Sequence, residues 1–346
     1  MRDADVNDAT LMERYGLRDN RDWKLAEARK MLRNDDHWED KLIRVAYRPF
    51  DTRWSYFSEA AIDYPRRELI ENVAGKTNIC LGIGRAGMAV NEAIWSLQTI
   101  SRVPMDANIY RRGGVNIFPL WLYPRQSTDL LDANPREKTA NLAPDFLDAL
   151  TQAGGRTPSP EDALAYIYAI LYAPAYRARY ADFLKRDFPR VPLPANHTLF
   201  DALVKAGHEL IALHTMQTTL ARITRYDVTG SNDVARVRWT PAANGLSGRV
   251  HINAEQYFDG VPQCVWDTHI GGYRVAEKWL KDRKGRRLSY DDLTHYQNVI
   301  AALSRTLDLQ TEIDSAIESA GGWLLADAPD LVDHRILTID VTNDLR

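Results

Sequence analysis

The sequence has 346 residues, of which 45% are hydrophobic and 26% charged, and its formal net charge is −3. This length predicts about two domains, with a core that needs no disulfide or metal to fold. The composition excludes collagen-like, disordered and disulfide-rich proteins. A nearly neutral chain does not coat nucleic acid indiscriminately, although it can carry a local basic surface.

The apolar segments are too short for a membrane protein. The longest run, from Ala163 to Ala173, ends at Pro174 and cannot span a bilayer as a helix. The first residues are charged and lack the apolar stretch of a secretory signal. We therefore expect a cytoplasmic protein with no membrane partner.

The N-terminal third is predicted to be rich in strands, with short helices. Apolar residues recur at helical spacing up to Leu32, and Asn34 ends that pattern. Alternating residues from Ile43 to Tyr47 predict a strand that ends at Pro49. In order, we expect a helix at 20–34, strands at 43–47 and 54–57, a short helix between 63 and 75, and strands at 78–83, 93–100 and 115–123.

Helical periodicity dominates the remainder of the chain. Ser159 followed by Pro160 is a strong helix start. A second helix is expected to end at Leu184, and Thr198 and Asp201 can cap a long third one. A β-hairpin is predicted from strands at 234–240 and 249–253, followed by helices at 273–281 and 291–318.

These elements predict a mixed α+β fold. A β-rich subdomain is expected first, and a mainly helical subdomain interrupted by the hairpin follows a polar connection that contains Pro135. The expected divisions are a helical lead-in at 1–40, the β-rich subdomain at 41–125, the connection at 126–141, the helical subdomain at 142–320 and a tail at 321–346.

The two cysteines, Cys80 and Cys264, lie far apart and belong to no C-x-x-C pair. A zinc ribbon or a redox dithiol is therefore not indicated. A single disulfide stays open, but two reduced, buried thiols are favoured in a cytoplasmic protein.

One glycine-rich segment, Gly82 to Gly87, matches the G-x-G-x-x-G pattern of dinucleotide-binding turns. A strand precedes it, but Met88 to Glu92 is a poor helix and no βαβ unit follows, so a turn or bulge in a sheet is favoured. A nucleotide-dependent enzyme that uses this turn stays open as an alternative. We find no spacing typical of a metal site and no residue that stands out as catalytic.

The clearest charged feature is the segment 271–290, which has seven Lys or Arg residues and two acidic residues. Arg274, Lys278 and Lys281 are spaced for one face of a helix. The glycines at 271–272 could leave free N–H groups at the start of that helix, which suit a phosphate. On charge alone, a solvated face is favoured over a DNA-facing one.

Arginine and aromatic residues also interleave at 47–54, where an arginine could reach a phosphate or a guanine edge or form a structural ion pair. Two further arginines precede Gly113 in an expected loop tip. The predicted DNA-contacting residues are Arg48, Arg53, Arg85, Arg111, Arg112, Arg274, Lys278, Lys281 and Arg283.

Several motifs occur in the order found in one known family. They are RDWK at 21–24, YRPFDTRW at 47–54, FPLWLYP at 118–124, YAILY at 168–172, GHEL at 207–210, HIGGY at 269–273 and KWLKDR at 278–283. From about Arg14 to about Asp314, the sequence resembles the C-terminal part of type ISP restriction–modification enzymes. That family joins a nuclease, a helicase-like motor, an adenine N6-methyltransferase and a target-recognition region in one chain.

The resemblance implies that this chain is the target-recognition region, with 1–40 leading in from a methyltransferase domain. It would bind a short, specific duplex-DNA site, with the methyltransferase and helicase domains as partners in cis. The Asn/Asp-Pro-Pro-Tyr/Phe motif of amino-methyltransferases is absent; the nearest segment begins at Asn134-Pro135. We therefore expect no catalysis by this chain alone and no cofactor in it, because S-adenosylmethionine, ATP and Mg²⁺ would serve the other domains. A docking scaffold that contacts those domains but no DNA bases is a further alternative.

Overall fold

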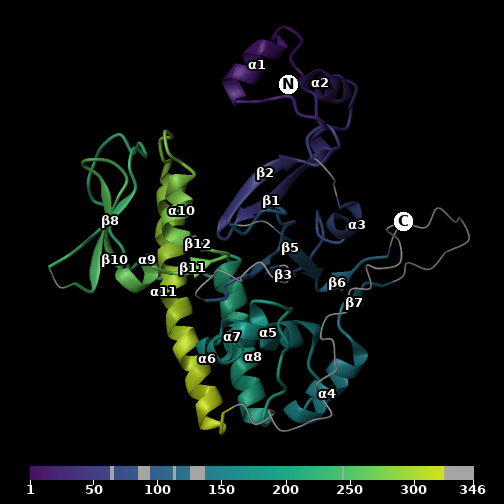
Figure 1. Ribbon diagram of the computed structural model, residues 1–346, viewed down its shortest axis with the longest axis vertical. Coiled ribbons are helices and arrows are strands. Elements are labelled where there is room, and N and C mark those ends of the chain that lie inside the picture. The colour runs from purple at the N-terminus through teal and green to yellow at the C-terminus, as the bar shows by residue number, and fades with distance from the viewer. Residues whose placement is uncertain (63–65, 85–93, 112–113, 125–136, 244, 323–346) are drawn as a thin grey trace, which may run out of the picture.

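The computed structural model describes residues 1–62, 66–84, 94–111, 114–124, 137–243 and 245–322. They have the mixed α+β fold that the sequence predicts, with small antiparallel sheets and short helices first, then long helices and a later sheet. Figure 1 shows the N-terminal helices at one end of the molecule, the first sheets in the middle and a helix bundle at the other end. None of the helices in the described ranges is long and apolar enough to cross a membrane.

The N-terminal end holds two helices, α1 (Asp8–Tyr15) and α2 (Leu25–Arg33). The sequence predicted only the second, because α1 buries a single residue, Leu11, and has a weak apolar period. Arg29 of α2 is buried, and its guanidinium donates to the backbone carbonyls of residues 1, 3 and 6. This side chain therefore ties the first residues of the chain to α2.

The β-rich part has the predicted order of strands. β1 (Leu42–Arg48) and β2 (Asp51–Tyr56) form an antiparallel hairpin, and β3 (Cys80–Gly84) pairs with both β4 (Gln98–Ser101) and β5 (Val115–Pro119). The short helix α3 (Arg67–Ile70) precedes this three-stranded sheet, and β6 (Trp121–Leu122) pairs with β7 (Thr139–Ala140) after it. Residues 125–136, most of the predicted connection, lie outside the described residues.

A bundle of helices follows. It consists of α4 (Pro144–Gly154), α5 (Pro160–Tyr172), α6 (Pro174–Arg179), α7 (Ala181–Leu184) and α8 (His197–His214). As predicted, the Ser159 side chain caps α5, because its oxygen accepts from the Asp162 N–H. The predicted cap of α8 was wrong: Asn196, one residue before the helix, accepts from the Leu199 N–H and leaves no such role for Thr198.

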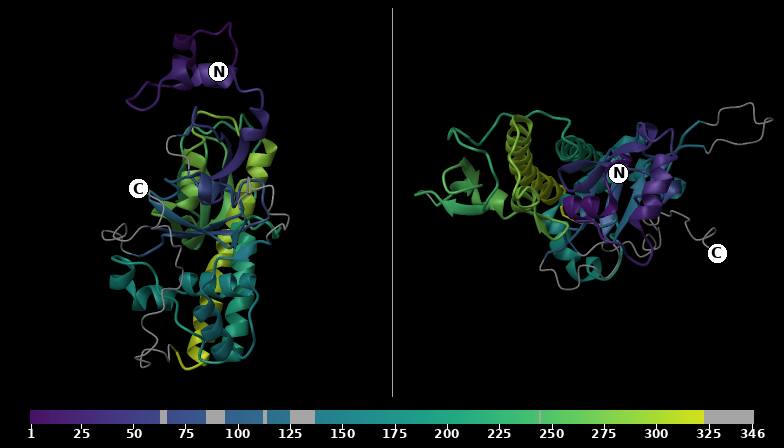
Figure 2. Two further views of the ribbon diagram at one scale, coloured as in Figure 1. Left: turned by 90° about the vertical axis from the view of Figure 1, so that its right-hand side faces the viewer. Right: turned by 90° about the horizontal axis from the view of Figure 1, so that it is seen from above.

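A second sheet and two helices complete the fold. β9 (Ser247–His251) lies between β8 (Arg238–Pro241) and β10 (Tyr257–Pro262), and the sequence predicted the β8–β9 hairpin but not β10. Short elements α9 (Gln263–Trp266), β11 (His269–Ile270) and β12 (Tyr273–Arg274) lead to α10 (Val275–Lys281) and the long α11 (Tyr290–Ser319). Figures 1 and 2 show the β8–β10 sheet across α11 from the β3–β5 sheet.

Both cysteines are free thiols. Cys80 is buried in β3, as expected, but Cys264 is exposed on α9, which corrects the prediction of two buried thiols. Cys80 lies in the central strand of the β3–β5 sheet, whereas Cys264 lies on the short helix that follows β10.

Candidate nucleic-acid interface

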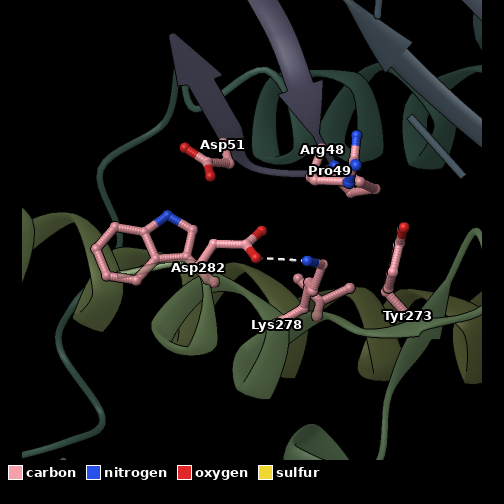
Figure 3. Close-up of a pocket in the computed structure, with 8 residues that line it drawn as sticks. Arg48, Pro49, Asp51, Tyr273, Lys278 and Asp282 are labelled. Atoms are coloured by element: carbon pink, nitrogen blue, oxygen red, sulfur yellow. Dashed lines mark hydrogen bonds and ion pairs between the residues drawn. The ribbon is translucent and has the colours of Figure 1, made fainter. Parts of the chain in front are cut away.

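Several predicted DNA-contacting residues meet where α10 faces the turn between β1 and β2; we call this region the α10 junction. Figure 3 shows Arg48 and Asp51 on the hairpin side and Tyr273, Lys278 and Asp282 on the α10 side. Outside the junction, Arg111 is exposed and its backbone N–H donates to the Gly271 carbonyl at 2.7 Å. Arg85 and Arg112 lie outside the described residues.

The three cations predicted to share the α10 face, of which Arg274 lies just before the helix, each have an acidic partner. The pairs are Arg274–Asp267 at 3.1 Å, Lys278–Asp282, and Lys281–Glu277 at 2.8 Å. Asp267 lies before the charged segment on which the sequence prediction rested, so the count of charges in that segment overstated the positive charge of this helix face. The predicted face exists, but its positive charge is largely compensated.

The two arginines of the hairpin, Arg48 and Arg53, both lie close to the ring of Tyr47. The guanidinium carbons of Arg48 and Arg53 are 4.0 and 3.8 Å from the ring centroid of Tyr47, within the range of cation–π attraction. Arg53 also pairs with Asp51 at 2.9 Å. The recess between the hairpin and α10 has a volume of about 10 Å³, room for about one water molecule, so a nucleotide does not fit there.

A buried ion pair holds the junction together. Arg283 Nη2 lies 3.0 Å from Asp51 Oδ1, and the guanidinium covers the Trp279 ring at 3.4 Å. Burial by itself would raise the pKa of the Asp51 carboxyl, but hydrogen bonds from Arg283 and Arg53 outweigh it and lower that pKa. Arg283 is only 8% exposed. The sequence analysis predicted that Arg283 contacts DNA, but its guanidinium is enclosed in the junction and does not face solvent.

The glycines at 271–272 do not open a helix, and the predicted phosphate seat there is wrong. They form the turn between β11 and β12, with φ values of 64° and 75°. The Gly271 N–H already donates to the Ser96 carbonyl at 2.7 Å. A Cβ at Gly271 would lie 2.2 Å from the Tyr110 ring, so this glycine serves close packing.

The glycine-rich segment begins inside the β3–β5 sheet. A Cβ at Gly82 would lie 2.7 Å from the Met105 sulfur, and one at Gly84 would lie 2.6 Å from Leu97. Both glycines are buried in the central strand of an antiparallel sheet. This packing agrees with the interpretation as a sheet feature; the rest of the motif, including Gly87, lies outside the described residues.

The comparisons with known proteins decide the family. Residues 2–312 match the family model described as the Type ISP C-terminal specificity domain. The chain belongs to this family. The comparison with curated proteins gave no match.

Three solved structures resemble the fold of this specificity domain. The first, "ATP-dependent Type ISP restriction-modification enzyme LlaBIII bound to DNA", is 20% identical with a TM-score of 0.65, over 86% of this chain and 20% of that chain. A nuclease-deletion mutant of the Type ISP enzyme LlaGI in complex with a DNA substrate mimic is 20% identical, TM-score 0.60, over 90% and 28%. A DrdV–DNA complex is 21% identical, TM-score 0.61, over 92% and 32%. The chain thus spans a third or less of each.

Outside the predicted set, the specificity domain has exposed cations that sequence reasoning did not select. Among the described residues, no acidic side chain forms an ion pair with Arg236, Arg238, Lys284, Arg286 or Arg287. Gly285 is the signal that could have found part of this group. It marks a turn after α10, where the helical spacing that pairs cations with acids no longer applies.

The same described residues contain no group of three or more His, Cys, Asp or Glu side chains that could hold a metal ion.

Proposed function

We propose that this specificity domain binds a short, specific site in duplex DNA and presents it to an adenine-N6 methyltransferase and restriction machine in the same polypeptide or complex. The observation that carries the proposal is the family match, because the model that covers residues 2–312 is described as a specificity domain. Support comes from the three structural relatives, which are described as complexes with DNA or with a DNA substrate mimic.

The proposal assigns base recognition to this chain and catalysis to other domains. Arg, Asn and Gln side chains would discriminate bases, at about 1–3 kcal/mol for each good bidentate contact. The near-neutral charge of −3 suits a protein that must reject non-specific DNA, whose binding depends on phosphate neutralisation. We further propose that this chain catalyses nothing alone, and that S-adenosylmethionine, ATP and Mg²⁺ serve other domains.

Selection from a random duplex pool tests the proposal. The 346-residue chain, and a longer protein that contains it, are each incubated with the pool, and bound duplexes are recovered and sequenced. We expect one short motif to be enriched. If neither protein enriches a motif, the assignment as a DNA reader fails.

A second measurement separates a reader from a nucleotide-dependent enzyme. The melting temperature of the chain is followed while S-adenosylmethionine or ATP is added, since a ligand that binds the folded state raises it. We expect no shift, and a saturable rise with either ligand would favour the enzyme.

A further inference from the structure

We infer that the domain contacts the phosphate backbone of duplex DNA through a surface that adjoins β8 and lies beyond the end of α10. This cation surface consists of Arg236, Arg238, Lys284, Arg286 and Arg287. The inference rests on the proposed function and deepens it, because it moves the phosphate contacts away from the α10 face that the sequence favoured.

Two chain segments are joined to form the cation surface. The Val234 N–H donates to the Arg286 carbonyl at 2.9 Å, and the Gly285 N–H donates to the Val234 carbonyl at 2.8 Å. An antiparallel bridge pairs Asp233 with Arg287. The turn at 284–287 therefore lies beside Asp233 and Val234, and Arg236 and Arg238 follow two and four positions later in the segment that leads into β8.

The charge of the cation surface is only partly compensated within the described residues. All five side chains are exposed, and none of them forms an ion pair there. Asp233 is the single acidic residue in the two stretches 232–238 and 284–288. Asp292 accepts hydrogen bonds from Ser289 in the cap of α11. Burial alone would raise the pKa of its carboxyl, but these hydrogen bonds and the charges of Arg283 and Arg286 lower it, so Asp292 offsets part of the charge of Arg286 without forming an ion pair with it.

The β8–β10 sheet, which carries Arg238, is packed against α11. The face opposite Arg238 carries Trp239, whose indole N–H donates to the Val261 carbonyl at 3.2 Å. On the same buried side, the ring of Phe258 lies 4.5 Å from the ring of Tyr296 in α11. Arg238 is thus held on the solvent side of a packed strand, because side chains alternate between the two faces of a sheet.

The pKa of His251 shows that positive charge gathers near Arg238. His251 is the register partner of Arg238 on β9. The pKa of the His251 imidazole is lowered by burial first and then by the positive charges of Arg238 and Arg249. Arg249 itself pairs with Asp259 at 3.0 Å, so the remaining positive charge lies toward β8 and not toward β10.

A polyanion fits such a surface. Clustered like charges repel one another, and a ligand with regularly spaced negative charges relieves that repulsion. Guanidinium groups match phosphate oxygens in geometry, and four of the five side chains are arginines. Because the chain is a specificity domain, the observations favour duplex DNA over an acidic segment of a protein.

Two triple variants with the same change in net charge test the inference. One is Arg236→Gln, Arg286→Gln, Arg287→Gln in the cation surface; the other is Arg274→Gln, Lys278→Gln, Lys281→Gln on the α10 face. The 346-residue chain and both variants are titrated with the duplex recovered in the selection, between about 50 and 200 mM salt. The first triple should lower the slope of log affinity against log salt by about 2 to 3, and the second by less than about 1.

Each outcome is decisive. If the wild-type chain binds the duplex but the first triple keeps its slope while remaining folded by melting temperature, the inference fails and the proposed function stands. If the slope of log affinity against log salt falls further for the α10 triple than for the first triple, the phosphates lie along α10 and the inference fails. If no duplex is bound at all, the proposed function fails first. Polyglutamate that binds the wild-type chain through these arginines more tightly than DNA would identify an acidic protein as the partner and overturn the inference.

Discussion

The α10 junction and the cation surface are both rich in Lys and Arg, yet they differ in what surrounds those side chains. At the junction, acidic residues from three parts of the chain, Asp51, Asp267 and Asp282, pair with the cations. At the cation surface no acidic side chain within the described residues forms such a pair. Positive charge along a sequence therefore measures the number of cations and not the potential that a ligand meets.

The difference has a functional reading. A compensated and aromatic-packed junction fixes β1, β2 and α10 relative to one another, which is a structural task. An only partly compensated surface on a packed sheet stays available to a ligand. If the junction tolerates loss of its charges, this assignment of roles is wrong. If junction variants change only stability and cation-surface variants change only DNA binding, the assignment holds.

The largest expected effect is at the buried ion pair of the junction. In Asp51→Ala, the buried Arg283 would lose its closer carboxylate and keep only Asp292, 3.6 Å from its Nε, so we expect the free energy of unfolding to fall by about 3 kcal/mol. Chemical denaturation measures this loss. The exposed Asp40, whose side chain is 82% accessible, supplies the control Asp40→Ala, which should be close to wild type.

A double variant separates loss of the pair from loss of packing. Asp51→Ala combined with Arg283→Met removes the buried charge together with its partner, and we expect it to recover part of the lost stability. An Asp51→Ala protein as stable as the control would show that the pair does not hold the junction.

The next effect concerns the sheet that carries Arg238. A Cβ at Gly248 of β9 would lie 2.3 Å from the Thr240 carbonyl oxygen and 2.6 Å from the Trp239 ring. Since the backbone cannot yield without disturbing the β8–β9 pairing, Gly248→Ala should lower the free energy of unfolding by about 1–3 kcal/mol. It should also weaken DNA binding. Unchanged stability by denaturation would mean that β8 is not held as described.

These contrasts show where sequence reasoning reached its limit. Local signals were enough to predict the strand at 43–47, the Ser159 cap and the β8–β9 hairpin, because residue alternation and helix capping act over a few residues. Seven motifs in a fixed order, those at 47–54 and 269–273 among them, predicted the family, and the specificity-domain match confirms it.

The site depended on contacts that no local pattern encodes. Arg283 meets Asp51 across 232 positions of sequence, and the Val234–Arg286 hydrogen bond joins segments that are 52 positions apart. The first contact hides a cation that was predicted to face DNA, and the second brings unselected cations together. Strand β10 was missed for a related reason, because its short segment contains Gly260 and Pro262 and reads as a turn.

A pH-dependent effect is expected beneath the junction. His214 is buried between the Tyr168 hydroxyl and the Thr306 hydroxyl, 5.4 Å from the Phe50 ring of the β1–β2 turn, and burial lowers its pKa to about 3. Below its ordinary pKa of 6.5, the unfolded chain binds a proton that the folded chain does not. The free energy of unfolding should therefore fall as the pH drops from 6.5 toward 5, and the contribution of this residue should steepen toward a limit of about 1.4 kcal/mol per pH unit.

Denaturation at several pH values tests this expectation. The quantity compared is the slope of the free energy of unfolding against pH, and not the stability at any one pH. His214→Phe should lose the part of the slope that this residue contributes between pH 6.5 and 5, while His251 and His295, whose pKa values burial also lowers, keep the remainder. It also leaves Tyr168 without its partner and lowers stability overall. The matched control is His37→Phe at an exposed position, 85% accessible, which should keep the wild-type slope. Equal slopes for both variants would place the acid sensitivity elsewhere.

The smallest expected effects come from two lysines only three positions apart, and they compare the two regions most directly. Lys281 is 55% exposed and pairs with Glu277 on α10, so Lys281→Gln should change stability by no more than about 1 kcal/mol and leave the salt dependence of DNA binding nearly unchanged. Lys284 lies in the turn of the cation surface without an ion pair among the described residues. Lys284→Gln should leave stability unchanged and lower the slope of log affinity against log salt by about 0.9. If instead Lys281→Gln lowers the slope and Lys284→Gln does not, the DNA lies on the compensated helix face. Lys281 would then exchange the carboxylate of Glu277 for a phosphate on binding, and that contact would release counterions from the DNA.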